Sequence, residues 1–211
     1  MTRRPTLERE RALWASGLRC VAGLDEVGRG PLAGPVVAAA VVLKPGSRAI
    51  RGLRDSKLLS GARRELLGAE IRRRAVAWAI GAASVREIDR LNVRVATALA
   101  CRRALERLPL QVEYVLLDGL PLPELGVPHE AVVDGDSRCH SIAAASVLAK
   151  LVRDRLMDLL GRRYPAFGWE RNKGYATRRH LLALDRLGPT PHHRRSFSPV
   201  VQLDAFGYRV F

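Results

Sequence analysis

The chain has 211 residues, 47% of them hydrophobic, and 36 Lys and Arg against 21 Asp and Glu give it a net charge of +15. This length supports a full hydrophobic core, and the absence of repeats or low-complexity segments predicts a folded globular protein. No apolar run is long enough to span a bilayer, and residues 1–17 lack the apolar core of a signal peptide, so we expect a cytoplasmic protein. The three cysteines include no C-x-x-C pair, which argues against a disulfide framework or a zinc site.

The excess of positive charge favours a polyanionic partner, usually nucleic acid. A surface coated with arginine for other reasons explains the same composition equally well. The basic residues are spread along the chain rather than collected in a tail, which slightly favours a basic face.

The first half of the chain predicts three strands. Residues 20–27 and 35–43 are apolar and predict neighbouring strands, and residues 44–59 form a loop that carries Asp55, Ser56 and Lys57. Ser60 is a suitable N-cap for a basic helix that extends to about Arg74. Residues 75–83 are apolar enough for the third strand.

The second half predicts two strand–helix units. Ser84 and Glu87 form a capping box for a short helix, and Asn92 caps a longer helix to about Arg107. Strands are expected over 112–117 and 129–133, followed by a long alanine-rich helix over 141–160. We therefore expect an α/β protein with a mixed five-stranded sheet, three antiparallel strands and then two parallel ones, flanked by helices. The expected organisation is a catalytic core over 18–163, a small helical appendage over 164–211 and an N-terminal extension over 1–17.

Acidic residues lie at the ends of three of these strands. Asp25 and Glu26 interrupt an apolar run, Asp118 follows a strand, and Asp136 follows another. Taken singly, each of the later acids is explained by turn chemistry, because Asp and Gly are common turn formers. Taken together, they predict convergence at the carboxyl edge of the sheet, where ligands of such folds gather. Carboxylates without cysteine pairs suit Mg²⁺ or Mn²⁺, two of which can promote phosphodiester cleavage.

One geometric condition applies to the pair Asp25 and Glu26. Neighbours on a regular strand point to opposite faces, so both can share a site only if the strand twists or ends there. The glycines of Gly28-Arg29-Gly30 permit such an ending and allow a ligand to approach the backbone. Arg29 between them carries a planar fork suited to phosphate.

These residues resemble bacterial ribonuclease HII over roughly residues 20–200. The resemblance rests on motifs that occur in the family's order: Asp-Glu-Val-Gly-Arg-Gly-Pro-Leu-Ala-Gly from Asp25, Asp55-Ser56-Lys57, Tyr-Val-Leu-Leu-Asp-Gly from Tyr114, Gly135-Asp136-Ser137, Ser-Ile-Ala-Ala-Ala-Ser-Val-Leu-Ala-Lys from Ser141 with Arg153-Asp154, Lys173-Gly174-Tyr175, and His-His-Arg-Arg-Ser-Phe from His192. It implies a ribonuclease H-like fold. It also implies endonucleolytic cleavage of RNA in RNA–DNA hybrids, including single ribonucleotides in duplex DNA, with a 3′-hydroxyl and a 5′-phosphate as products. Such an enzyme would serve ribonucleotide excision repair, and we expect it to be a monomer.

The resemblance also implies roles for individual residues. Asp25, Glu26, Asp118 and Asp136 match the four catalytic carboxylates, which would hold two Mg²⁺ or Mn²⁺ ions once substrate is bound. The resemblance assigns contact with the ribonucleotide's 2′-hydroxyl to Gly28, Arg29 and Gly30, contact with the neighbouring deoxyribose to Tyr175, and contact with phosphate to Ser56 and Lys57. Asp134 departs from the family pattern, which often has lysine there, and this changes the local charge beside Asp136.

Several features have simpler explanations beside these. An i,i+4 ion pair accounts for Lys150 and Asp154, with a supporting role beside the site as the alternative. The adjacent His192 and His193 are expected at the surface rather than on a metal. Two other functions are consistent with the sequence: a DNA junction nuclease of the same fold, and a non-catalytic nucleic-acid-binding module.

Overall fold

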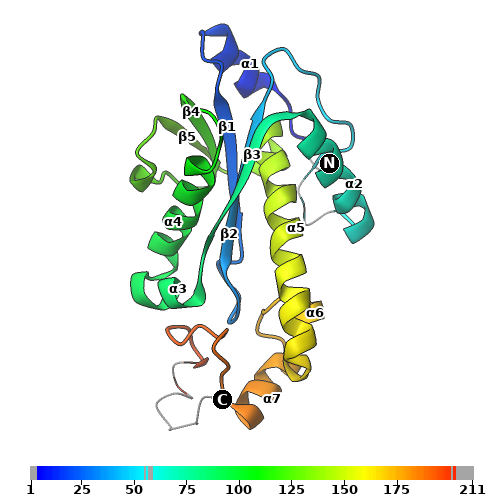
Figure 1. Ribbon diagram of the computed structural model, residues 1–211, viewed down its shortest axis with the longest axis vertical. Helices are drawn as coiled ribbons and strands as arrows, with labels where there is room; N and C mark the ends of the chain where they lie inside the picture. Colours follow the sequence, from blue (N-terminus) through cyan, green and yellow to red (C-terminus); the bar gives the residue numbers. More distant parts are fainter. Residues whose placement is uncertain (1–3, 55, 57–58, 201, 203–211) are drawn as a thin grey trace. The chain divides into compact units, whose positions relative to one another are not determined.

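A computed structural model describes residues 4–54, 56, 59–200 and 202 of the chain. A five-stranded sheet in the order β3-β2-β1-β4-β5 runs through it (Figure 1). The strands are β1 (Val21–Val27), β2 (Val36–Leu43), β3 (Ala75–Ala83), β4 (Tyr114–Asp118) and β5 (His129–Val132). Strand β1 pairs antiparallel with β2 and parallel with β4, and β4 pairs parallel with β5. The predicted mixed sheet of five strands is confirmed.

The predicted helix signals are also confirmed. The helices are α1 (Glu8–Ala15), α2 (Gly61–Arg74), α3 (Val85–Leu91), α4 (Val93–Glu106), α5 (His140–Arg163), α6 (Trp169–Asn172) and α7 (Arg178–Leu187). Ser60 accepts a hydrogen bond from the backbone of Arg63, and Ser84 and Glu87 form the reciprocal capping box. The Asn92 side chain accepts hydrogen bonds from the first amides of α4.

The chain forms two compact units. The first consists of Met1–Val27, Val37–Ala82 and Ala98–Leu151, and the second consists of Gly28–Val36, Ala83–Thr97 and Val152–Phe211. The second unit therefore takes in segments from the first half of the sequence as well as the C-terminal part. The division expected from the sequence, with a core over 18–163, stays a prediction.

Small residues bring helices close to both faces of the sheet in the first unit. A Cβ at Gly23 of β1 would lie 2.2 Å from the Ser141 carbonyl carbon, so the start of α5 packs directly on the strand backbone. A Cβ at Gly81 of β3 would lie 2.0 Å from the Ala100 oxygen of α4. Figure 1 shows α4 and α5 on opposite sides of the strands. The alanines predicted to make a long helix therefore also permit its close packing.

The N-terminal segment, expected as an extension, contributes to the core of the first unit. Leu7 belongs to the same buried cluster as Ala144 and Leu148 of α5. Glu10 of α1 is fully buried, and its carboxylate accepts hydrogen bonds of 2.7 Å from both the amide and the hydroxyl of Ser141. An acidic side chain at this position satisfies free amides and interacts favourably with the helix dipole of α5.

A second core holds the C-terminal segments together. Phe167, Trp169 and Leu184 are buried in it. The expectation that both histidines of the pair lie at the surface is wrong for His193, which is 1% exposed. Its Nε2 lies 3.0 Å from Nε2 of the buried His180, and its Nδ1 accepts a hydrogen bond from the Thr190 amide. The sequence of two adjacent histidines does not distinguish a pair with one buried ring from a pair with both rings exposed.

No helix in the described part of the chain has the length and apolar character needed to cross a membrane.

Candidate active site

Parallel pairing places the predicted acidic residues at one edge of the sheet. Leu24 of β1 pairs with Leu117 of β4, so Asp25 and Asp118 come next on the two neighbouring strands. Neighbouring strands lie roughly 4.8 Å apart, which brings these two carboxylates into the same region. Asp118 in turn pairs with Val132 of β5, shortly before the turn that carries Asp136. Three segments distant in sequence therefore deliver acids to one carboxyl edge.

Strand β1 ends shortly after the adjacent acids, but Glu26 still pairs with Ala38 of β2, so a site shared by both side chains stays a prediction. The strand ends at Val27, one residue after Glu26, and Gly28 then has φ +94°, in the region that favours glycine. Asp25 is 6% exposed, whereas Glu26 is half-buried. The two side chains therefore differ in environment although they are neighbours.

A hydrogen bond fixes the turn that carries Asp136. The Gly135 amide donates to Oδ1 of Asp118 at 2.6 Å. The turn lies over Gly135–Ser137, directly after Asp134, which has φ 53° and an exposed side chain. A carboxylate that accepts a backbone amide is held in one orientation, and here that bond links β4 to the turn after β5. Asp136 itself is 8% exposed.

The electrostatics of Asp25 show that the four carboxylates act on one another. Burial raises the pKa of Asp25 well above its ordinary value, and the charges of Glu26, Asp118 and Asp136 raise it further. A hydrogen bond from Ser146 of α5 acts in the opposite direction and lowers that pKa. Buried like charges are unfavourable unless something compensates for them, so this arrangement has the chemistry of a cation site.

Ser56 reaches this cluster indirectly. Its side chain is 3% exposed, and its Oγ lies 3.0 Å from Oγ of Ser146, the residue that hydrogen-bonds Asp25. The predicted phosphate contact of Ser56 stays a prediction. The structure places it in a chain of hydroxyls behind the carboxylate. Its predicted partner Lys57, like Asp55, lies outside the described residues.

The acidic cluster fits a hard divalent cation by residue type. All four donors are carboxylates, the ligands that Mg²⁺ and Mn²⁺ prefer in proteins. Among residues 4–54, 56, 59–200 and 202, no three His, Cys, Asp or Glu side chains are already set so that they could hold a metal ion. The carboxylates are therefore within electrostatic range of one another without being closed around a metal position.

The second predicted group of residues lies together in the second compact unit. We call residues 28–36 the glycine–arginine loop. Arg29 and Gly30 of this loop are exposed, and a Cβ at Gly30 would lie 3.7 Å from Cε1 of Tyr175. The Tyr175 side chain is 48% exposed. The structure thus brings Gly30 and Tyr175 side by side at the surface, and their predicted contacts with the two sugars stay predictions.

Two arginines that the sequence analysis left without a role lie behind this loop. Arg153 and Arg194 are both fully buried and donate hydrogen bonds to backbone carbonyls of the loop. Both stood in motifs quoted for the resemblance, and that was the only signal that could have found them. Lys150 and Asp154, the predicted supporting residues, are each half-buried on α5, and their roles stay predictions.

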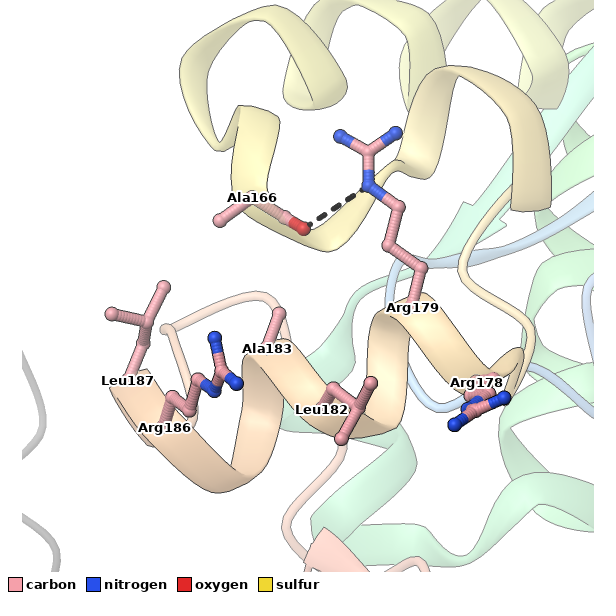
Figure 2. Close-up of a pocket in the computed structure, with 7 residues that line it drawn as sticks. All are labelled: Ala166, Arg178, Arg179, Leu182, Ala183, Arg186 and Leu187. Carbon is pink, nitrogen blue, oxygen red and sulfur yellow. Dashed lines mark hydrogen bonds between the residues drawn. The ribbon is translucent and has the colours of Figure 1, made fainter.

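A pocket of about 570 Å³ lies along α7 and includes none of the predicted site residues (Figure 2). Its walls combine apolar and arginine side chains, namely Ala166, Leu182, Ala183 and Leu187 with Arg178, Arg179 and Arg186. Arg179 donates to the Ala166 carbonyl across it. The lining holds no carboxylate, so this pocket lacks the groups needed for cation-assisted hydrolysis.

The fold and the acidic edge define a class, the ribonuclease H-like α/β proteins. The crystal structure of the ribonuclease H2 from Pyrococcus horikoshii matches the chain with a TM-score of 0.75 and 24% identity, covering 88% of this chain and 97% of that one. The PCNA:RNase HII complex from Archaeoglobus fulgidus matches with a TM-score of 0.71 and 26% identity, over 85% of this chain and 95% of that one.

Within that class, the chain belongs to the ribonuclease HII family. The family model for Ribonuclease HII matches residues 22–200. The ribonuclease HII of Synechococcus sp. is 53% identical over 203 residues, which cover 95% of this chain and 91% of the relative. That of Cereibacter sphaeroides is 55% identical over 197 residues, or 93% of this chain and 92% of the relative. The family is one of nucleases, and membership supports ribonuclease H activity on RNA–DNA hybrids.

We expect the substitution Asp25→Asn to increase the free energy of unfolding. In the unfolded chain this carboxyl ionises near pH 4, whereas in the folded protein its pKa is raised. Between these two values the folded form binds the extra proton, so the stability of the wild type falls as the pH rises. The amide has no such cost, so its advantage grows as the pH rises through this interval from about 4, and it disappears in acid.

Thermal denaturation of both proteins across this pH range measures the effect. Asp185→Asn, at an exposed position of α7, is the matched control and should leave the stability unchanged at every pH. A wild type as stable as the Asp25→Asn variant at neutral pH would contradict the proposed repulsion among these carboxylates.

Proposed function

We propose that this protein cleaves the RNA strand of RNA–DNA hybrids and also cuts at single ribonucleotides embedded in duplex DNA. The products are a 3′-hydroxyl and a 5′-phosphate, and the role is ribonucleotide excision repair by a cytoplasmic monomer. The observation that supports the proposal is geometric: the register of β1 with β4 and the bond from the Gly135 amide to Asp118 bring acids from three segments near the buried Asp25, whose pKa they raise. No ordinary turn explains why acids from three segments influence one buried carboxyl.

The cofactor is Mg²⁺ or Mn²⁺, with two ions in the substrate complex, held by Asp25, Glu26, Asp118 and Asp136. When bound, the ions lower the pKa of the attacking water and stabilise the charge on the leaving oxygen. A related fold supports this choice: the Bst-RNase HIII crystal structure in complex with Mn²⁺ matches the chain with a TM-score of 0.62 at 19% identity.

The protein's own residues orient this chemistry. The amide of Gly135 fixes one oxygen of Asp118, and the hydroxyl of Ser146 holds Asp25. Both bonds come from groups whose positions are set by secondary structure, so the carboxylates need little rearrangement as the reaction begins. The net charge of +15 attracts the polyanionic substrate toward an acidic centre that would otherwise repel it.

Selectivity for ribose comes from the glycine–arginine loop and Tyr175. The 2′-hydroxyl distinguishes RNA from DNA at a given position, and glycine lets backbone groups approach a sugar closely. The ring of Tyr175 beside Gly30 then packs on the neighbouring deoxyribose, where an extra hydroxyl would be excluded.

One prediction of the proposed function concerns the cleavage step. Asp118→Asn should reduce cleavage of a duplex carrying one ribonucleotide by at least about a thousandfold in Mg²⁺ or Mn²⁺, because it removes a charge from the cation site. Asp185→Asn is the matched control, since it removes one carboxylate charge at an exposed position of α7, outside the predicted site residues. It should cleave as the wild type does.

Gel analysis with mapped ends measures both variants. Cleavage of all-DNA junctions in place of the ribonucleotide site would favour the junction nuclease. Binding that depends steeply on salt without any divalent-dependent turnover would favour the non-catalytic module.

Another prediction concerns selectivity for ribose. Tyr175→Ala should lose more cleavage at a single embedded ribonucleotide than affinity for all-DNA duplex, roughly tenfold more, because it removes the surface that packs on the sugar. Tyr175→Phe keeps the ring and should retain most of the cleavage. Kinetics and duplex binding measured side by side test this, and equal losses of both quantities in Tyr175→Ala would mean that Tyr175 is only structural.

A further inference from the structure

Two positively charged side chains are buried behind the glycine–arginine loop. Arg153 and Arg194, which we call the guanidinium pair, both have 0% exposure. Charged side chains are almost never fully buried unless their hydrogen-bonding groups find partners. Here the partners are backbone carbonyls, and most of them belong to one short segment.

Arg194 binds both the beginning and the end of that segment. It donates to the carbonyl of Gly28, to that of Arg29 at 2.7 Å, and twice to that of Gly34 at 2.8 and 3.1 Å. The two arms of one planar group thus join both ends of the loop. Only a guanidinium offers enough donors in a fixed plane to do this.

Arg153 holds the other side and reaches the segment that carries Tyr175. It donates to the carbonyls of Ala33 at 3.1 Å and Pro35 at 3.0 Å, and to that of Lys173 at 3.0 Å. The Leu32 amide also donates to the Gly174 carbonyl at 2.9 Å. The loop is therefore tied to the backbone directly before Tyr175.

The bonds of Arg194 set the direction of two peptide groups. In a trans peptide the N–H points opposite to the C=O of the same plane. Because the carbonyls of Gly28 and Arg29 point toward the buried guanidinium, the amides of Arg29 and Gly30 point to the opposite side of the loop. Arg29 and Gly30 are exposed, and Gly30 adjoins the ring of Tyr175.

We propose that Arg194, assisted by Arg153, is a positioning residue that orients the peptide groups of the glycine–arginine loop for recognition of a ribonucleotide sugar. This inference rests on the proposed function. The inference goes beyond the proposed function because it assigns part of the selectivity for ribose to two buried side chains that do not contact the substrate. Burial and the charge of the neighbouring Arg153 lower the pKa of Arg194 to about 9, which shows that the two guanidinium groups repel each other. The hydrogen bonds to the loop carbonyls hold them in place despite this repulsion. The ring of Phe197, with its centroid 5.0 Å from the Arg194 guanidinium carbon, completes the enclosure.

The test compares affinities for two duplexes that differ only in one 2′-hydroxyl. All proteins carry Asp118→Asn to prevent cleavage, and each is titrated with all-DNA duplex and with the same duplex containing one ribonucleotide. Arg194→Lys keeps the charge but replaces three donor nitrogens in a fixed plane by one ammonium nitrogen, so it should lower the ratio of the two affinities by about tenfold while affinity for all-DNA duplex is retained. Circular dichroism and thermal denaturation establish that it is folded.

Arg195→Lys is the matched control, because it makes the same substitution at the next position in the sequence. The backbone amide of residue 195 donates to Asp89, and a change of side chain preserves this bond. It should keep the wild-type ratio. A folded Arg194→Lys protein with an unchanged ratio would overturn the positioning role. A parent protein that binds both duplexes equally would instead contradict the proposed function itself.

If Arg194→Lys does not fold, the same ratio of affinities measured for Phe197→Leu tests the positioning role. This milder change loosens the enclosure of the guanidinium without removing it, and it should lower the same ratio by a smaller factor. An unchanged ratio in folded Phe197→Leu would then count against the proposal.

Discussion

The repulsion among carboxylates around Asp25 is the constraint on which the rest of the site depends. A buried acid whose pKa is raised by burial and by three acidic neighbours destabilises the folded protein, so the surrounding structure must hold it in place. Parallel pairing of β1 with β4, and of β4 with β5, fixes where the acids emerge. The close packing of α5 against Gly23 fixes the helix that supplies Ser146. In the proposed function a divalent cation bound here would relieve the repulsion, which would couple the stability of the site to its chemistry.

The second compact unit also buries like charges, but there the charges are positive. Two guanidinium groups are buried there, and backbone carbonyls of the glycine–arginine loop satisfy them. In both units, charge is placed where it is unfavourable and is held by hydrogen bonds: Asp118 accepts one from the Gly135 amide, and the two arginines donate to backbone carbonyls. Such arrangements are typical of functional sites, because stability alone would favour apolar side chains at these positions.

The sequence predicted those features whose causes are local. Apolar runs ending in acids indicated both the strands and the acidic edge, and the caps at Ser84 and Asn92 marked helix starts, because these signals lie within a few residues of one another. Glu10 and Arg194 were missed because their partners are distant: Arg194 contacts Gly28 across 166 positions of sequence. The burial of His193 was missed because it depends on the packing of Phe167 and Trp169 around its ring. A basic residue in a chain with 36 Lys and Arg gives no sign of burial, and only the folded chain reveals the carbonyls around it.

The most direct test of the central claim is a carbon-detected NMR titration of the aspartate and glutamate carboxyl groups in the metal-free protein, repeated with Mg²⁺. The account predicts that Asp25 titrates well above the ordinary range for an aspartate, about 4, and that its pKa falls when Mg²⁺ is added. An Asp25 that titrates normally and does not respond to Mg²⁺ would contradict the proposal that these acids form a cation site.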